Sequence, residues 1–342
     1  MKKEKDIDLN VDDIKIEDKT TLPIEDTYEI PSEDASSTTI IDEDDINDDI
    51  NIEDDTTLPI EDTYEIPSED ASSTTIIDED DINIEDKKAP IIMLFGPPTS
   101  GKSMTLVRLA RYLRTLGYTV KANTTFKADN TYKERCDKFH KNLNSKEALD
   151  GNALNEFLMV KIINHGATIC QILEAPGEHY FNPKKPDDIS ARNFRPYLTQ
   201  IIRNLPNRKI WVFITEAEWH VHASVKDSYV SRIRNCKHQL LRNTDDVIIL
   251  YNKIDQKEEL FENGHLHISS AEKAMKDEYE GLSSVFKNQN PITSLWRPNN
   301  YRFVPFCTGY YTKQVSGNPK YNESEEMYPR LLWEQLMKCI KG

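Results

Sequence analysis

The chain has 342 residues, of which 59 are acidic and 43 basic, and these charges are unevenly placed. Residues 1–88 contain 32 acids and seven lysines, which leaves 27 acids and 36 bases for the rest. No apolar run is long enough for a signal peptide or a membrane span, and the five cysteines lack the spacing of zinc ligands. These features exclude a disulfide-rich secreted domain and favour a cytoplasmic protein with no membrane partner. The basic excess lacks interleaved aromatic residues, so nucleic acid is not an expected partner.

The first predicted segment is an acidic tail over residues 1–88. Residues 20–47 recur identically at 56–83, which is a 28-residue segment at a period of 36. Each copy has few apolar residues and two prolines, so burial cannot offset the entropy of ordering, and we expect disorder. Three interpretations stay open: a motif for a protein partner that is presented twice, a solubilising spacer, or a tail that lies against the basic body and screens it from other anions.

The strongest motif follows this tail directly. The apolar run at 89–95 predicts a strand buried on both faces, and residues 102–116 predict an amphipathic helix. Between them lies a match to the phosphate-loop pattern G-x-x-x-x-G-K-[ST], whose amides and helix N-terminus point at phosphate oxygens. We expect Lys102 to bridge the β- and γ-phosphates of a nucleotide and Ser103 to coordinate Mg²⁺. The predicted phosphate-binding residues are Gly96, Pro97, Pro98, Thr99, Ser100, Gly101, Lys102, Ser103 and Met104.

A second motif indicates which base is bound. Residues 246–251 predict a buried strand that leads into Asn252, Lys253, Ile254 and Asp255, which fit the pattern N-K-x-D. A carboxylate here can accept hydrogen bonds from the ring N–H and the exocyclic amine of guanine, which adenine does not present together. We therefore predict that Asp255 selects guanine, that Lys253 lies over the base and that Asn252 braces the two loops.

A third motif lies between these two. Residues 167–173 predict a strand that runs into Glu174-Ala175-Pro176-Gly177, which resembles the D-x-x-G switch of GTPases. Glu174 replaces the usual aspartate and is one methylene longer. The resemblance implies that Glu174 contacts Mg²⁺ and that the Gly177 amide reaches the γ-phosphate, so that the loop orders only with that phosphate. The next residues, Glu178 and His179, are equal candidates for orienting the attacking water.

Together the motifs resemble those of a P-loop GTPase of the TRAFAC class, which contains translation factors and Ras-like proteins. A predicted antiparallel hairpin, with strands at 155–163 and 167–173, favours this class. The segment from Gly177 to Phe181 is also similar to bacterial double-GTPase proteins. The resemblance implies GTP or GDP and Mg²⁺ as cofactors.

The resemblance also assigns two less distinct features. A last strand at 301–306 would place Cys307 and Thr308 where a backbone amide contacts the guanine oxygen. The switch threonine has two candidates, Thr124 and Thr125. Basic residues after the switch are candidates for an arginine finger, an anion contact or a solvated surface: Lys184, Lys185, Arg192 and Arg195.

The predicted fold is α/β, a three-layer P-loop NTPase similar to a G domain over residues 89–342, with a mostly parallel sheet and one antiparallel edge hairpin. The predicted function is that of a Mg²⁺-dependent GTPase or GTP-dependent switch that hydrolyses GTP to GDP. Two alternatives stay open: a non-hydrolysing guanine-nucleotide scaffold, and an ATPase or kinase that shares only the phosphate loop. A protein partner would bind the acidic tail or the switch region.

Overall fold

The computed structural model describes residues 82–145, 157–312 and 320–342, all within one compact unit, Ile76–Gly342. The predicted tail repeat lies outside the described residues except for its last two positions.

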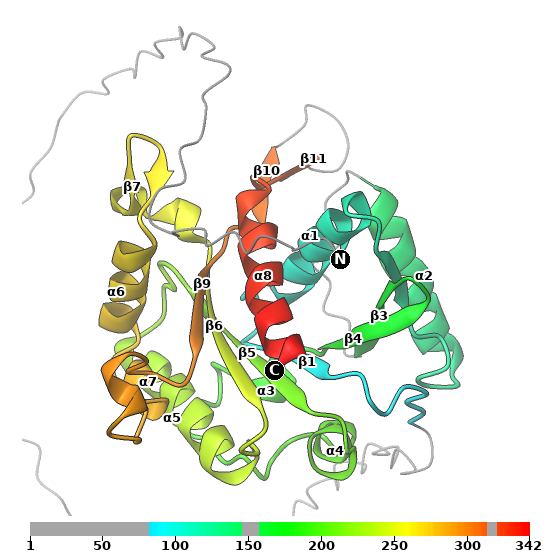
Figure 1. Cartoon of the computed structure of the whole chain (residues 1–342), viewed down its shortest axis with the longest axis horizontal. Coiled ribbons are helices and arrows are strands. Elements are labelled where there is room, and N and C mark those ends of the chain that lie inside the picture. The colour runs from blue at the N-terminus through cyan, green and yellow to red at the C-terminus, as the bar shows by residue number, and fades with distance from the viewer. Residues whose placement is uncertain (1–81, 146–156, 313–319) are drawn as a thin grey trace, which may run out of the picture. The chain divides into compact units, whose positions relative to one another are not determined.

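Seven strands form one mixed sheet in the order β2-β3-β4-β1-β5-β6-β9 (Figure 1). Only β3 runs against the others: it pairs with β4 in the predicted hairpin and with β2, which forms the edge. The central strands are rich in Ile, Val, Leu and Phe because helices cover both of their faces, as predicted. The strands are β1 Ile91–Phe95, β2 Thr119–Ala122, β3 Leu158–Asn164, β4 Ala167–Glu174, β5 Lys209–Glu216, β6 Asp246–Asn252 and β9 Arg302–Pro305.

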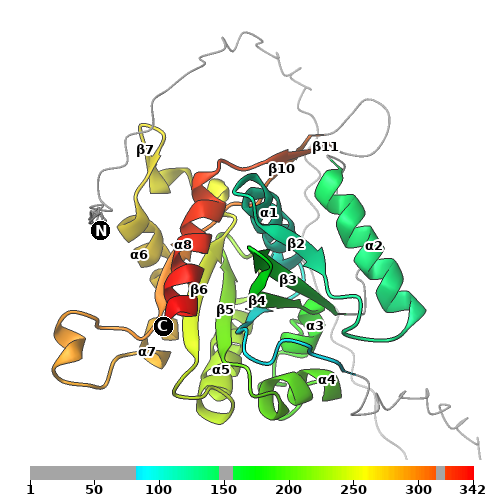
Figure 2. The same cartoon turned by 45° about the vertical axis from the view of Figure 1, so that its right-hand side comes forward.

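Helices lie on both faces of the sheet, which gives the predicted α/β layers (Figure 2). α1 and α8 pack against each other, α2 lies against β2 and β3, and α5 packs against α7. No helix among the described residues is long and apolar enough to cross a membrane. The helices are α1 Lys102–Thr115, α2 Asn130–Asn144, α3 Gly177–Tyr180, α4 Pro196–Thr199, α5 Ala223–Gln239, α6 Ile268–Glu278, α7 Leu282–Val285 and α8 Met327–Lys341.

The strand order reverses between β1 and β4. The chain leaves β1 through α1 toward β2 on one side, whereas it leaves β4 through α3 and α4 toward β5 on the other. In open α/β sheets this reversal opens a crevice at the carboxyl ends of the strands, where ligands bind. The phosphate loop follows β1 and Glu174 ends β4, so both predicted motifs lie at this crevice.

The described chain begins with residues 82–88, which pack on the body although their composition matches the acidic tail. Ile84 is buried, and Asn83 N donates to Phe126 O at 3.0 Å. The Glu85 carboxylate pairs with Lys161 of β3, which lowers the pKa of Glu85 through that hydrogen bond. The ordered body therefore starts before the change in composition at residue 89.

Two short hairpins project from the sheet layers. β7 Phe261–Glu262 pairs with β8 His265–Leu266, and β10 Gly309–Thr312 pairs with β11 Lys320–Glu323. The second hairpin directly follows Cys307 and Thr308 and reaches α1, where the Tyr311 hydroxyl donates to Met104 Sδ at 3.1 Å.

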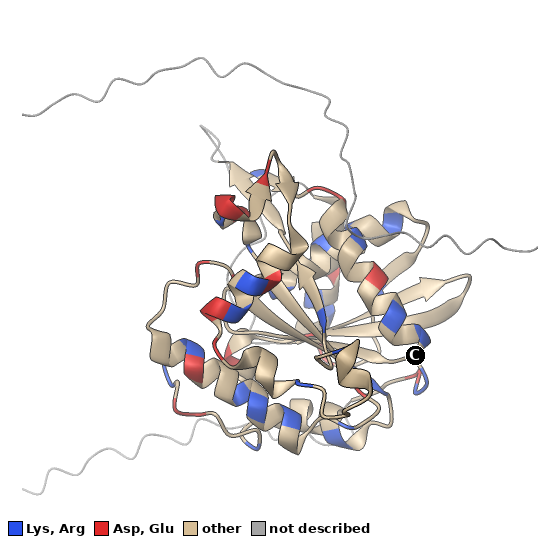
Figure 3. Ribbon diagram, turned by 60° about the vertical axis from the view of Figure 1, so that its left-hand side comes forward, with Lys and Arg blue, Asp and Glu red and all other residues tan. Residues whose placement is uncertain are grey.

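The helices carry acidic and basic residues side by side (Figure 3). On α6, Lys273 pairs with Asp277 and Lys276 with Glu272, each four positions apart. The outer face of this helix is therefore mixed in charge, and such exposed pairs contribute little to stability.

Candidate functional site

The phosphate loop connects β1 to α1 in a shape that depends on glycine. Gly101 has a φ of 86°, and a Cβ atom there would lie 2.4 Å from the Asn252 side chain. Thr99 also has a positive φ, 64°, which is unfavourable for a β-branched residue and is a feature found at functional loops. Pro97 and Pro98 have no N–H, so any amides for phosphate come from the later part of the loop.

Lys102 is buried and its ammonium group is turned onto the loop itself. Its Nζ donates to the carbonyl oxygens of Gly96 and Pro97, at 3.1 and 2.7 Å. Burial lowers the pKa of Lys102 to about 8, although the nearby Glu174 and Glu178 carboxylates favour the charged form. A phosphate oxygen would give this ammonium an anionic partner in place of the two carbonyls.

Ser103, Glu174 and Arg135 meet beside the loop. Ser103 Oγ donates to Glu174 Oε1, and Arg135 Nη2 lies 3.4 Å from Glu174 Oε2. Among the described residues no cluster of three His, Cys, Asp or Glu side chains forms a metal site. Mg²⁺ in nucleotide sites needs only one or two protein oxygens besides phosphates and waters, so Ser103 and Glu174 fit this ion.

The switch loop touches the phosphate loop. A Cβ atom at Gly177 would lie 2.2 Å from the backbone nitrogen of Pro98, so only glycine allows this approach. His179 Nδ1 lies 2.8 Å from the Tyr197 hydroxyl, and burial lowers the pKa of His179 to about 4, which leaves it neutral at pH 7. Glu178, not His179, lines the two pockets described below.

The two candidates for the switch threonine lie elsewhere. Thr125 Oγ1 is 2.8 Å from both Glu85 Oε1 and Asn123 Oδ1. Neither Thr124 nor Thr125 is among the residues that line the pocket around Ser103.

The N-K-x-D segment is tied to the phosphate loop. Asn252 is fully buried, and its Nδ2 donates to Ser100 O at 2.8 Å. Lys253 has a φ of 60°, and its Nζ donates to the carboxylate of Glu216, which ends β5 and is only 2% exposed. The brace predicted for Asn252 is therefore present, whereas Lys253 pairs with an acid that no motif indicated.

The loop after β9 lies beside Asp255. Burial, together with the nearby Asp255 carboxylate, raises the pKa of the Cys307 thiol to about 12. Thr308 O accepts a hydrogen bond from the Tyr321 hydroxyl, and the Thr308 methyl is 3.7 Å from where a Cβ of Gly101 would lie. The structure thus brings the predicted base-contacting segments and the phosphate loop together.

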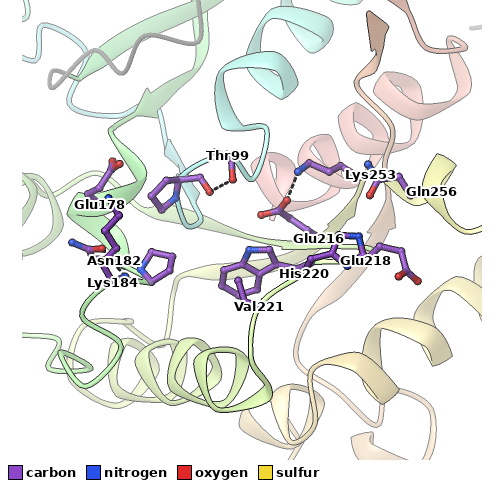
Figure 4. A pocket seen from close by; sticks show the side chains of 13 residues that line it. Thr99, Glu178, Asn182, Lys184, Glu216, Glu218, His220, Val221, Lys253 and Gln256 are labelled. Carbon is purple, nitrogen blue, oxygen red and sulfur yellow. Dashed lines mark hydrogen bonds and ion pairs between the residues drawn. The ribbon is translucent and has the colours of Figure 1, made fainter. Parts of the chain in front are cut away.

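Two pockets flank the phosphate loop. The α1 pocket, about 380 Å³, is lined by Lys102, Ser103, Arg135, Glu174 and Tyr311 among others. The β5 pocket, about 960 Å³, lies on the other side (Figure 4). It is lined by Pro98, Thr99, Glu178, Asn182, Pro183, Lys184, Glu216, Glu218, Trp219, His220, Val221, Lys253 and Gln256.

The sequence motifs assigned no nucleotide contact to several residues of these pockets, among them Arg135, Tyr311 and Glu216. Arg135 lies in a helix without a motif, and Tyr311 lies in a hairpin that the sequence pattern did not predict. Glu216 had a signal, because it is an acid at the carboxyl end of a buried strand, where ligands collect in open sheets.

No protein-family model and no curated protein matches the chain. Among solved structures, it is similar to the GTP-bound Ski7 GTPase-like domain of S. cerevisiae, with 13% identity over 74% of this chain and 50% of that one, and a TM-score of 0.40. It is also similar to GDP-bound Roco2 of Methanosarcina barkeri, with 12% identity over 73% of this chain and 50% of that one, and a TM-score of 0.31. A third similar structure is the signal recognition particle receptor SRb-GTP/SRX complex of Chaetomium thermophilum, with 12% identity over 72% of this chain and 98% of that one, and a TM-score of 0.37. The chain spans half the length of the Ski7 and Roco2 chains.

Proposed function

We propose that this protein binds guanine nucleotides and hydrolyses GTP to GDP with Mg²⁺. The observation that carries the proposal is the hydrogen bond of Asn252 to Ser100 O, which joins the N-K-x-D segment to the phosphate loop. A nucleotide whose phosphates lie on that loop would have its base within reach of Asp255. Both segments lie at the carboxyl edge of the sheet, on β1 and β6, with only β5 between them.

Guanine is the base that suits the exposed carboxylate of Asp255. This carboxylate accepts two hydrogen bonds from the N–H groups on one edge of guanine, whereas the corresponding edge of adenine lacks this pair of donors. The neighbouring Cys307 and Thr308 supply backbone groups at the other side of the base. A phosphate loop alone would serve ATP equally, so Asp255 is what separates the two classes.

In hydrolysis, a water oxygen forms a bond to the γ-phosphorus while the bond from that phosphorus to the β–γ bridging oxygen breaks, giving GDP and inorganic phosphate. Lys102 stabilises the charge on the transferring group, and Gly177 brings its amide beside the same group. Glu178 lies on the pocket wall, where it can orient the water. Ser103 and Glu174 would hold Mg²⁺, which would neutralise charge at the phosphates.

A non-hydrolysing scaffold is the second candidate. It is favoured by the Glu174 carboxylate, which is already satisfied by Ser103 and Arg135, and by Glu178, whose negative charge is unfavourable next to a triphosphate. We further propose that a protein partner meets the switch region at the β5 pocket, which Glu178 and Thr99 border.

The test is nucleotide binding by the full chain and by Asp255→Asn. We expect the wild type to prefer GTP and GDP over ATP, and the variant to lose at least ~100-fold in GTP affinity because a polar mismatch in a base pocket is costly. The variant should gain affinity for xanthosine triphosphate, whose 2-oxo group accepts from the new amide. Glu258→Gln, an exposed acid in the same loop, is the matched control and should behave as wild type.

Phosphate release measured in the same samples separates the two candidates. Turnover supports the GTPase, whereas guanine-selective binding without turnover supports the scaffold. A wild type that prefers ATP would refute the guanine pocket.

A further inference from the structure

The α2 helix carries an arginine whose position the proposed function does not yet use. Arg135 is 6% exposed, although long charged side chains are seldom buried without several partners. Its Nη2 faces Glu174 at 3.4 Å, while its Nη1 is buried without a hydrogen-bond partner. A buried guanidinium nitrogen without an acceptor is unfavourable, so the site is built for an acceptor that a ligand would supply.

The surroundings of Arg135 identify the kind of acceptor. Arg135 lines the α1 pocket together with Lys102, Ser103 and Lys138, so three cationic side chains converge on one cavity beside a helix N-terminus. The only acids among the lining residues are Glu174 and Glu178. The pocket therefore suits an anion with several oxygens, and the phosphates of a nucleotide are such an anion.

The position of Arg135 is fixed by the packing of α2. The helix begins at its N-cap Asp129, whose side chain accepts from Tyr132 N at 2.6 Å. The buried Tyr132 hydroxyl donates to Asn123 O and accepts from Met159 N, which ties the helix to the strands β2 and β3. Arg135 is three residues further along, on the same buried face, so its side chain enters the pocket from a rigid support.

We propose that Arg135 binds the γ-phosphate of the bound nucleoside triphosphate and stabilises the charge that develops there during hydrolysis. The chain thus supplies its own arginine to the reaction instead of depending on one from a partner. Without nucleotide, Glu174 is the counter-ion of Arg135; with nucleotide, the free Nη1 and the fork of the guanidinium meet phosphate oxygens. This inference rests on the proposed function only for the hydrolysis step, because the γ-phosphate contact can be measured for any triphosphate.

The experiment compares the full-length wild type with Arg135→Ala, Arg135→Lys and Lys133→Ala. Lys133 is exposed on the same helix, so its removal controls for the loss of a positive charge from α2. The first readout is the ratio of affinities for a non-hydrolysable triphosphate and the matching diphosphate. The second readout is the single-turnover rate of phosphate release.

We expect Arg135→Ala to weaken triphosphate binding ~10-fold while diphosphate affinity stays within about two-fold, since the contact is to the γ-phosphate alone. Hydrolysis should slow by ~10³-fold, the lower end of what an arginine contributes to this reaction. Arg135→Lys should lie in between, because it keeps the charge but loses the planar fork. Lys133→Ala should match the wild type in both readouts.

Unchanged diphosphate affinity shows that a variant is folded, and Arg135→Lys takes the place of Arg135→Ala if the latter does not fold. An Arg135 variant with the wild-type affinity ratio, or with faster hydrolysis, would overturn the proposal and leave Arg135 as the counter-ion of Glu174. A wild type that binds guanine nucleotides without hydrolysing them would refute only the GTPase, because the affinity ratio still tests Arg135. Preference for ATP would refute only the guanine pocket, and the same ratio is then measured with adenine nucleotides.

Discussion

At the residue scale, the buried ammonium of Lys102 would make the proposed nucleotide binding depend on pH. Burial has lowered its pKa to about 8, from 10.5 for a free lysine, so the group loses its proton as the pH rises through 8. Phosphate binds the charged form. Without nucleotide, the unfolded chain binds more protons than the folded one between pH 8 and 10.5, so the contribution of Lys102 to folding stability rises with pH in that window.

We therefore expect the affinity for GDP to fall ~10-fold between pH 7 and pH 9, as the charged fraction of Lys102 falls. Isothermal titration at each pH measures this change. Lys102→Met should bind weakly and without this pH dependence. Burial also lowers the pKa of Lys209 to about 8, and this lysine is present in the wild type and in Lys102→Met. If the affinity of Lys102→Met for GDP still falls between pH 7 and pH 9, a group other than Lys102 causes the pH dependence.

At the scale of elements, the β10–β11 hairpin adds an aromatic side chain to the proposed nucleotide site. Tyr311 lines the α1 pocket and contacts Met104, the residue after the phosphate-loop serine, and its ring lies 5.5 Å from that of Tyr321. Tyr310, its neighbour on the same strand, is 61% exposed and lines neither pocket. The alternation of side chains along a strand thus separates the two tyrosines.

Replacing Tyr311 by alanine should weaken nucleotide binding by about ten-fold, which is the lower part of the range for an aromatic contact to a base. Tyr310→Ala should bind as wild type does. Titration of a fluorescent guanine nucleotide into the two variants measures both affinities. Equal affinities would mean that the hairpin does not touch the ligand.

The same scale shows how far elements can be predicted. The Ile and Val runs of β5 and β6 predicted buried strands, because a strand covered on both faces has no polar side to show. The short hairpin of β10 and β11 escaped prediction because each strand has only four residues and most of them are exposed, so only their pairing identifies them.

For the whole molecule, the segment 82–88 crosses from the β2 loop to the region before β5. Asp86 O accepts hydrogen bonds from the side chains of Gln171 and Asn207, at 3.0 and 2.9 Å. Ile84 is buried and belongs to the main hydrophobic core, as does Phe126. The hexapeptide at 81–86 recurs identically at 49–54, so composition alone gives no reason to separate one copy from the other.

Ile84→Asp should lower the free energy of unfolding by about 2 kcal/mol or more, through lost burial and a buried charge. Ile52→Asp, at the same place in the earlier copy of the hexapeptide, is the matched control and should leave stability unchanged. Urea unfolding of the full chain, followed by tryptophan fluorescence, compares them. If both variants unfold at the wild-type midpoint, the segment contributes nothing to the stability of the body.

The sequence by itself indicated the phosphate loop, the N-K-x-D segment and the strands β1, β3, β4, β5, β6 and β9, because each of these depends on local spacing and periodicity. It also indicated Glu174, Gly177 and the two residues after them. Only the tertiary structure decided that Glu178 and not His179 lines the pockets, since Tyr197 holds the imidazole away. Arg135 and Tyr311 likewise come from distant segments, and long-range packing, which leaves no local pattern, brings them to the site.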